Sequence, residues 1–192
     1  IGAEIGGDLT SYNLSWTEPW WHNKPLSVGF DLYSTYQEQT GYDWWRRGGA
    51  LRFSKADGNY GRYSWRYDYE AIRVENINSS APQEVRDEAN YPTNDCSKRR
   101  SGSITLGYAH DTRDDNNFPM QGHFWSVSNE IAAKPLGGNI SFDRPLVSYA
   151  WYHPIMTTHV FAIRCQYGTM TNFFDKKNDI PATEKFYSGG SD

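Results

Sequence analysis

A strict alternation of aromatic and charged residues constrains this chain more than any other feature of its sequence. Successive side chains of an extended strand point to opposite faces, so a period of two separates two surfaces. Within residues 60–76 one face would carry Tyr63, Trp65, Tyr67, Tyr69 and Ala71, and the other Ser64, Arg66, Asp68 and Glu70. The pattern predicts a strand whose rings are buried in a soluble sheet or face lipid in a membrane barrel.

The same two-faced pattern recurs along the chain. Besides residues 60–76, it covers residues 11–16, 26–32, 46–54, 103–108, 125–131, 147–151 and 161–167. Many of these segments approach the roughly 9–11 residues of a tilted membrane strand. Turn residues separate them, and no helix is expected. We predict an all-β, antiparallel up-and-down fold of about eight strands, with a further partial strand at the N-terminus.

Composition restricts the classes of protein to which a chain with such strands can belong. Aromatic residues make up 16% of the chain, yet its mean hydropathy is strongly polar. A soluble sugar-binding domain reaches this combination with exposed rings, and an outer-membrane barrel reaches it with aromatic girdles. A net charge of -4 provides no basic field for nucleic acid. No apolar run approaches the roughly 18 residues of a membrane helix, so any crossing would use strands.

The connections between the predicted strands differ in length. Short turns are expected at 18–25, 56–61, 111–122 and 153–159, which are alternate connections. The opposite connections include the long polar loop 77–100 and the tail that begins near residue 169. Outer-membrane barrels have short periplasmic turns and longer surface loops, so we expect the short turns to face the periplasm.

Two tryptophan doublets and two cysteines stand out beside these turns. The doublets are Trp20 with Trp21 and Trp44 with Trp45, and we interpret them as interfacial anchors in preference to sugar-stacking platforms. Cys96 and Cys165 fit neither a metal pair nor a disulfide-dense scaffold, and whether they pair stays open.

The acidic turn at residues 111–122 admits a structural and a chemical interpretation. The Arg113 guanidinium can pair with Asp111, Asp114 or Asp115 and hold a tight connection, and we prefer this structural staple. The alternative is a metal or acid-base cluster formed by the three aspartates with His110. No phosphate loop, nucleophile elbow or zinc-protease helix accompanies it, so the sequence predicts no catalytic residue, cofactor or metal.

The same turn carries a resemblance to a known family. Asp111-Thr112-Arg113-Asp114-Asp115 followed by Phe118-Pro119-Met120-Gln121-Gly122 is similar to a turn of the bacterial surface-antigen barrels, the BamA-type assembly-factor family. Three further matches follow the family's order: Thr17-Glu18-Pro19-Trp20, Pro135-Leu136-Gly137-Gly138 and Phe186-Tyr187-Ser188-Gly189-Gly190. The last resembles the start of the family's long inward-folded loop, with Phe186, Tyr187, Gly189 and Gly190 as its first residues.

This resemblance implies a fold, a place and a function. Residues 1–192 would be part of a single barrel domain, roughly strands three to eleven of about 16, with POTRA domains and terminal strands outside them. The place would be the outer membrane of Gram-negative bacteria. The function would be to fold, insert or translocate β-rich clients, with outer-membrane lipid, unfolded clients and periplasmic lipoproteins as partners. A soluble carbohydrate-binding β domain and a passive or two-partner secretion pore remain open as alternatives.

Overall fold

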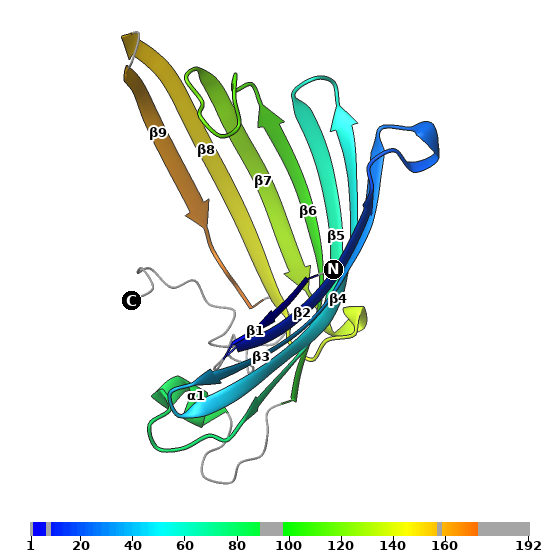
Figure 1. Cartoon of the computed structure of the whole chain (residues 1–192), viewed down its shortest axis with the longest axis vertical. Helices are drawn as coiled ribbons and strands as arrows, with labels where there is room; N and C mark the ends of the chain where they lie inside the picture. Colours follow the sequence, from blue (N-terminus) through cyan, green and yellow to red (C-terminus); the bar gives the residue numbers. More distant parts are fainter. Residues whose placement is uncertain (1, 7–8, 89–97, 157–158, 173–192) are drawn as a thin grey trace.

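A computed structural model of the chain describes residues 2–6, 9–88, 98–156 and 159–172. These residues form one nine-stranded antiparallel sheet in which the strands follow one another in sequence order (Figure 1). The strands are β1 (Gly2–Ile5), β2 (Leu9–Glu18), β3 (Leu26–Gln39), β4 (Tyr42–Asp57), β5 (Gly61–Glu75), β6 (Lys98–Asp111), β7 (Gly122–Ala132), β8 (Phe142–Met156) and β9 (His159–Gly168). The predicted all-β, up-and-down fold is confirmed.

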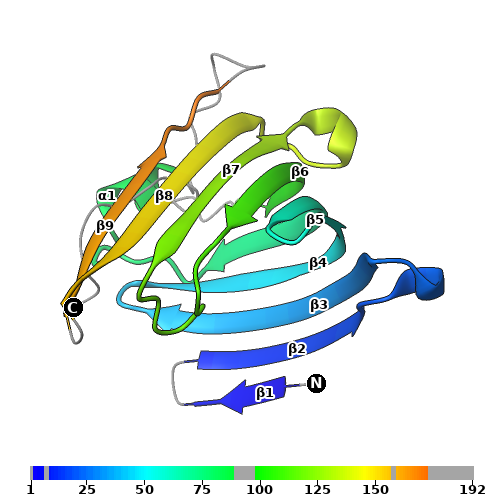
Figure 2. The same ribbon diagram turned by 90° about the horizontal axis from the view of Figure 1, so that it is seen from above.

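The sheet curves into a trough with a concave and a convex face (Figure 2). β1 and β9 lie at its two edges, so within the described residues the sheet is open rather than closed into a barrel. Cross-strand partners share a face, and the register therefore extends each strand's alternation across the whole wall. The rings predicted on one face of β5 lie on the convex face, and its charges lie on the concave face.

The connections divide between two rims, which we name by their content. The turn rim joins β2 to β3, β4 to β5, β6 to β7 and β8 to β9, and the loop rim joins the other consecutive pairs (Figure 1). The expected sorting by length is only partly correct. A two-residue turn, Thr40–Gly41, lies on the loop rim, while the turn rim includes the longer segment 112–121. Gly41 has φ +93°, so the tight turn depends on the freedom of glycine.

The described part of the long polar connection between β5 and β6, residues 76–88, has more secondary structure and packing than its composition suggests. Contrary to the expectation of no helix, it contains α1 (Gln83–Glu88). Ile77 and Ala81 are buried and pack against Tyr42 and Val74, which anchors the connection at the loop rim. This packing, rather than helix propensity, explains the local order. Among the described residues, no helix is long and apolar enough to cross a membrane.

Large apolar side chains on the convex face are exposed. Leu32 is 52% exposed, Leu51 49% and Leu106 55%, although each lies in the middle of a strand. Of the described residues, the largest side chain that is fully buried is Phe142. A water-soluble sheet would cover such a continuous apolar face, because extended apolar patches are unfavourable in water. Periodicity left open whether this face is buried in a soluble sheet or faces lipid in a barrel. The exposure of its apolar side chains favours a face that meets lipid.

Candidate functional site

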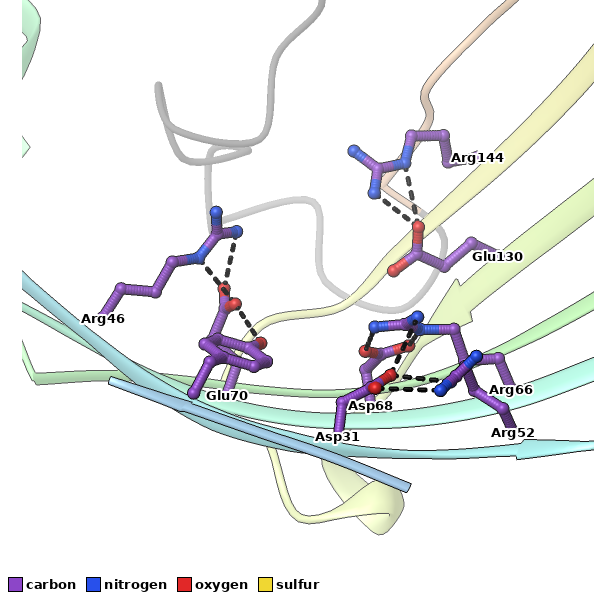
Figure 3. A network of polar contacts seen from close by, with 9 residues as sticks. Asp31, Arg46, Arg52, Arg66, Asp68, Glu70, Glu130 and Arg144 are labelled. Atoms are coloured by element: carbon purple, nitrogen blue, oxygen red, sulfur yellow. Dashed lines mark hydrogen bonds and ion pairs between the residues drawn. The ribbon is translucent and has the colours of Figure 1, made fainter. Parts of the chain in front are cut away.

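The concave face carries an ion-paired wall that we call the inner charge network (Figure 3). It comprises four carboxylates and four guanidinium groups on β3, β4, β5, β7 and β8. Its members are Asp31, Arg46, Arg52, Arg66, Asp68, Glu70, Glu130 and Arg144. The formal charges of this set cancel, so the network gives the concave face polar character without net charge.

Glu70 anchors the first part of the network. It is only 7% exposed. Its carboxylate accepts hydrogen bonds from Arg46 Nε at 2.6 Å, from Arg46 Nη2 at 3.0 Å and from Tyr33 Oη at 2.6 Å. A buried carboxylate requires such partners, because removing a charge from water is otherwise costly. The contacts join β3, β4 and β5 through one side chain.

The second part of the network connects the same three strands nearer the turn rim. Arg52 Nη2 donates to Asp31 Oδ1 at 2.9 Å. Arg66 binds Asp68 with two hydrogen bonds, at 2.6 and 2.7 Å, and its Nη1 lies 3.7 Å from Asp31 Oδ2. Arg66, Asp68 and Glu70, which the sequence places on one face of the strand, all belong to this network, although Glu70 pairs with Arg46 rather than with Arg66.

The third part lies across the trough on β7 and β8. Arg144 donates to Glu130 through both Nε, at 3.0 Å, and Nη2. A hollow of about 530 Å³ lies between this pair and the rest of the network, and small polar residues such as Ser103 and Thr105 complete its lining. Each carboxylate of the network is held by arginine, so the wall offers polar contacts without a free acid or base.

The motif turn between β6 and β7 is organised by its aspartates. Arg113 donates to Asp111 from Nε at 2.8 Å and from Nη2 at 2.6 Å. Asp114 and Asp115 instead accept backbone N–H groups of the turn. Thr112 Oγ1 contacts His123 at the start of β7 and donates to its carbonyl oxygen at 3.1 Å. Of the three candidate partners for Arg113, the structure brings it to Asp111.

Backbone donors set the electrostatics of this turn. The N–H of Gln121, followed by those of Met120 and Asp115, lowers the pKa of the Asp114 carboxyl below its ordinary value. The N–H groups of Phe118 and Asn117 lower the pKa of Asp115 in the same way. Hydrogen bonds to the ionised form favour that form. Both aspartates therefore stay charged to a lower pH than an ordinary aspartate does.

The end of the motif has a steric explanation. Gly122 has φ +105°, and a Cβ there would lie 2.3 Å from the carbonyl oxygen of Thr112. Only glycine fits this return into β7. Phe118 is 84% exposed, and Pro119 follows it. Among the described residues no group of three or more potential metal ligands is found.

The tryptophan doublets occupy different surroundings. Trp20 and Trp21 lie in the connection between β2 and β3, where they are 59% and 39% exposed. Trp44 and Trp45 are neighbours on β4 and point to opposite faces: Trp44 lines the hollow of the concave face, and Trp45 lies on the convex face beside Tyr36, with ring centroids 4.5 Å apart. The position of Trp44 does not suit an anchor in lipid.

Sequence reasoning missed a row of contacting rings along the convex face near the turn rim. Tyr63 contacts Tyr108, with centroids 4.7 Å apart, and Tyr108 contacts Trp125 at 5.3 Å. Further ring pairs in this row are Trp16 with Phe30, Phe53 with Trp65 and Trp151 with Phe161. The rings are visible in the sequence, but only the strand register shows that they are neighbours.

Some candidate residues lie outside the described part of the chain. These are Cys96 and the predicted start of the inward loop, Phe186, Tyr187, Gly189 and Gly190. Cys165 is described, and its thiol is free and exposed on β9.

An open up-and-down sheet with an exposed apolar convex face and an ion-paired concave face is the wall of a transmembrane β-barrel. The whole chain, residues 1–192, matches the Omp85 superfamily domain. This chain belongs to the Omp85 superfamily, as its motif turn suggested, and its place is the bacterial outer membrane. Membership excludes the soluble sugar-binding domain that composition had left open.

Two curated relatives are similar to nearly the whole chain. One is the outer membrane protein assembly factor BamA of Nitratidesulfovibrio vulgaris, 26% identical over 197 residues that cover 100% of this chain and 23% of the relative. The other is the outer membrane protein assembly factor BamA of Neisseria meningitidis serogroup B, 24% identical over 192 residues that cover 93% of this chain and 23% of the relative. The chain thus spans about a quarter of the length of these relatives.

A solved structure supports the fold independently. The crystal structure of BamA from Haemophilus ducreyi lacking POTRA domains 1–3 superposes with a TM-score of 0.81 at 16% sequence identity. The match covers 98% of this chain and 37% of that chain. The nine strands therefore correspond to part of a larger barrel in that structure.

Proposed function

We propose that this chain forms part of the barrel wall of an outer-membrane protein assembly factor, which folds and inserts β-rich client proteins. The observation that carries the proposal is the two-faced open sheet in a chain of the Omp85 superfamily. The similarity to two BamA proteins supports the assembly role over that of a secretion pore. Residues 1–192 would lie within a single barrel domain, with POTRA domains and terminal strands elsewhere in the protein.

The proposed activity uses strand pairing and membrane disturbance rather than covalent chemistry. Unpaired strand edges bind other strands through backbone hydrogen bonds. Here β1 and β9 would pair with the remaining strands of the barrel, and the described wall would hold their spacing. Unfolded outer-membrane proteins and outer-membrane lipid are the proposed partners, and accessory lipoproteins would act from the periplasm. No catalytic residue, cofactor or metal is proposed.

Structural roles are proposed for the motif turn and the exposed tryptophans. The turn rim would face the periplasm and the loop rim the cell surface. Arg113 with Asp111 would staple the connection between β6 and β7, since bidentate pairs between arginine and carboxylate combine charge with fixed geometry. Trp20, Trp21 and Trp45 would anchor at the membrane interfaces, which amphipathic indoles prefer.

Depletion of the full-length protein in its own bacterium tests the assembly role. We expect many folded outer-membrane barrels to fall together, measured by heat-modifiable gel mobility of the outer-membrane fraction, and to recover when the gene is restored. Loss of a single secreted protein, with the other barrels unchanged, would instead establish a two-partner secretion pore. Unchanged barrels and loss of ion conductance would establish a passive pore.

A further inference from the structure

Three arginines gather on the convex face near the loop rim. Arg47 on β4 and Arg100 on β6 flank Ala71 of β5 in one row across the sheet, and Arg73 follows in the next row beside Trp45. Together with one carboxylate, Glu75, they line a hollow of about 340 Å³. A positively charged hollow is unexpected on this face, because most of its side chains are apolar and meet lipid.

The charges of this cluster are not balanced as they are on the concave face. Arg73 pairs with Glu75, whose Oε1 lies 2.6 Å from its Nε. Arg47 stacks over Trp45, with Cζ 4.9 Å from the ring centroid. Among the described residues, no carboxylate pairs with the side chain of Arg47 or Arg100. Two neighbouring cations on a lipid-facing wall favour an anion between them.

The position of the arginine cluster relative to the membrane indicates which anions can reach it. Tyr63, in the ring row near the turn rim, and Arg73 are separated by ten residues on the same face of β5. At about 3.3 Å per residue this is roughly 33 Å of strand, and a tilt of about 40° reduces the height to roughly 25 Å. An apolar band is also about 25 Å tall. If the ring row marks one interface, the arginines lie at the headgroup level of the opposite leaflet.

We propose that Arg47 and Arg100, with Arg73 and Trp45 beside them, bind the phosphate of a membrane lipid headgroup. Guanidinium groups bind phosphate oxygens through paired, charge-assisted hydrogen bonds, and stacking of Arg47 on Trp45 prepares one such group. The Trp45 ring would pack against the apolar part of the same lipid. The hollow opens on the convex face rather than into the polar trough, which favours a lipid over free phosphate as the source of the anion.

Lipid retention by the full-length protein in neutral detergent tests this site. Native mass spectrometry would count dimyristoyl phosphatidic acid bound to the wild type, to Arg47→Gln with Arg100→Gln, and to Lys55→Gln. Lys55 is a matched control because it is an exposed cation on the same face of β4, near the opposite rim. We expect the double variant to lower the apparent affinity about tenfold. Lys55→Gln should change it by less than about twofold.

Two further arms separate the sources of the anion. Dimyristoyl phosphatidylcholine should be retained less than phosphatidic acid, and a millimolar excess of inorganic phosphate should not displace the lipid. Equal loss in Lys55→Gln and the double variant, equal retention of both lipids, or displacement by inorganic phosphate would overturn the proposal. Heat-modifiable mobility checks that each variant folds. If the double variant does not fold, Arg47→Lys replaces it and should reduce retention, because lysine lacks the guanidinium fork.

Discussion

Glu70 shows how a single carboxylate can join three strands of the wall. It is buried, and it accepts hydrogen bonds from Tyr33 on β3 and Arg46 on β4. We predict that Glu70→Ala lowers the free energy of unfolding by about 2–3 kcal/mol, because Arg46 and Tyr33 lose their shared acceptor and the side-chain hydrogen bonds that join β3, β4 and β5 are broken. Urea unfolding of the full-length barrel in lipid vesicles measures this loss.

A neighbouring carboxylate provides the control for Glu70. Asp68 is 21% exposed at its side chain, against 9% for Glu70, while their partners Arg66 and Arg46 are equally exposed, at 42% and 41%. Asp68→Asn should therefore cost no more than about 1 kcal/mol, the usual value of a solvated pair. Glu70→Gln should fall between the two, since the amide oxygen still accepts a hydrogen bond from Tyr33. Equal losses for Glu70→Ala and Asp68→Asn would contradict the role given to burial.

For single residues, the sequence predicts the face of the strand on which a side chain lies better than it predicts which side chain it contacts. Alternation correctly separates Arg66, Asp68 and Glu70 from the rings of β5. It does not show that Glu70 meets Arg46, because that contact depends on the register between β4 and β5. The same alternation argues against treating Trp44 and Trp45 as one unit, since adjacent residues of a strand point to opposite faces.

Among the elements, β6 depends on a close approach that only glycine allows. A Cβ at Gly102 would lie 2.0 Å from the carbonyl oxygen of Leu136, which also accepts a hydrogen bond from Tyr67 Oη at 2.9 Å. We predict that Gly102→Ala displaces the connection between β7 and β8 and lowers the free energy of unfolding by about 2 kcal/mol. Urea unfolding in vesicles measures the change.

Gly107 on the same strand is the matched control for Gly102. A Cβ there meets the Ser64 hydroxyl at 2.6 Å, and the nearest backbone atom among its closest contacts is 3.6 Å away. The serine side chain can rotate away, so Gly107→Ala should cost about 1 kcal/mol less than Gly102→Ala. If the two variants were equally stable, the close approach of Gly102 to the Leu136 carbonyl oxygen would have no measurable role in stability.

Element boundaries were predictable where local patterns set them. The alternation located all the strands, including the partial one at the N-terminus. It placed the long loop through residue 100, whereas β6 begins at Lys98 and pairs there with β5. α1 was missed because it lies in a polar segment, and the packing of Ile77 and Ala81 against Tyr42 and Val74 just before it is not visible in the sequence pattern.

For the whole molecule, the central claim is that the convex face meets lipid and the concave face meets water. The curvature of the sheet and the register of its strands are visible only in the structure. Periodicity could not decide between a soluble sheet and a barrel, because it is the same in both. The exposure of Leu32, Leu51 and Leu106 on the convex face makes the distinction. The central claim requires that adjacent residues of one strand face different surroundings, one lipid and the next water.

Paired labelling on β6 tests that claim most directly. In the full-length protein with all native cysteines, Cys96 and Cys165 among them, replaced by serine, Thr105→Cys and Leu106→Cys place single thiols on opposite faces. After insertion into lipid vesicles, we predict that a water-soluble maleimide labels position 105, and that brominated lipid tails quench a fluorophore attached at position 106 before insertion. Equal maleimide labelling at both positions, without quenching at 106, would contradict a lipid-facing convex wall.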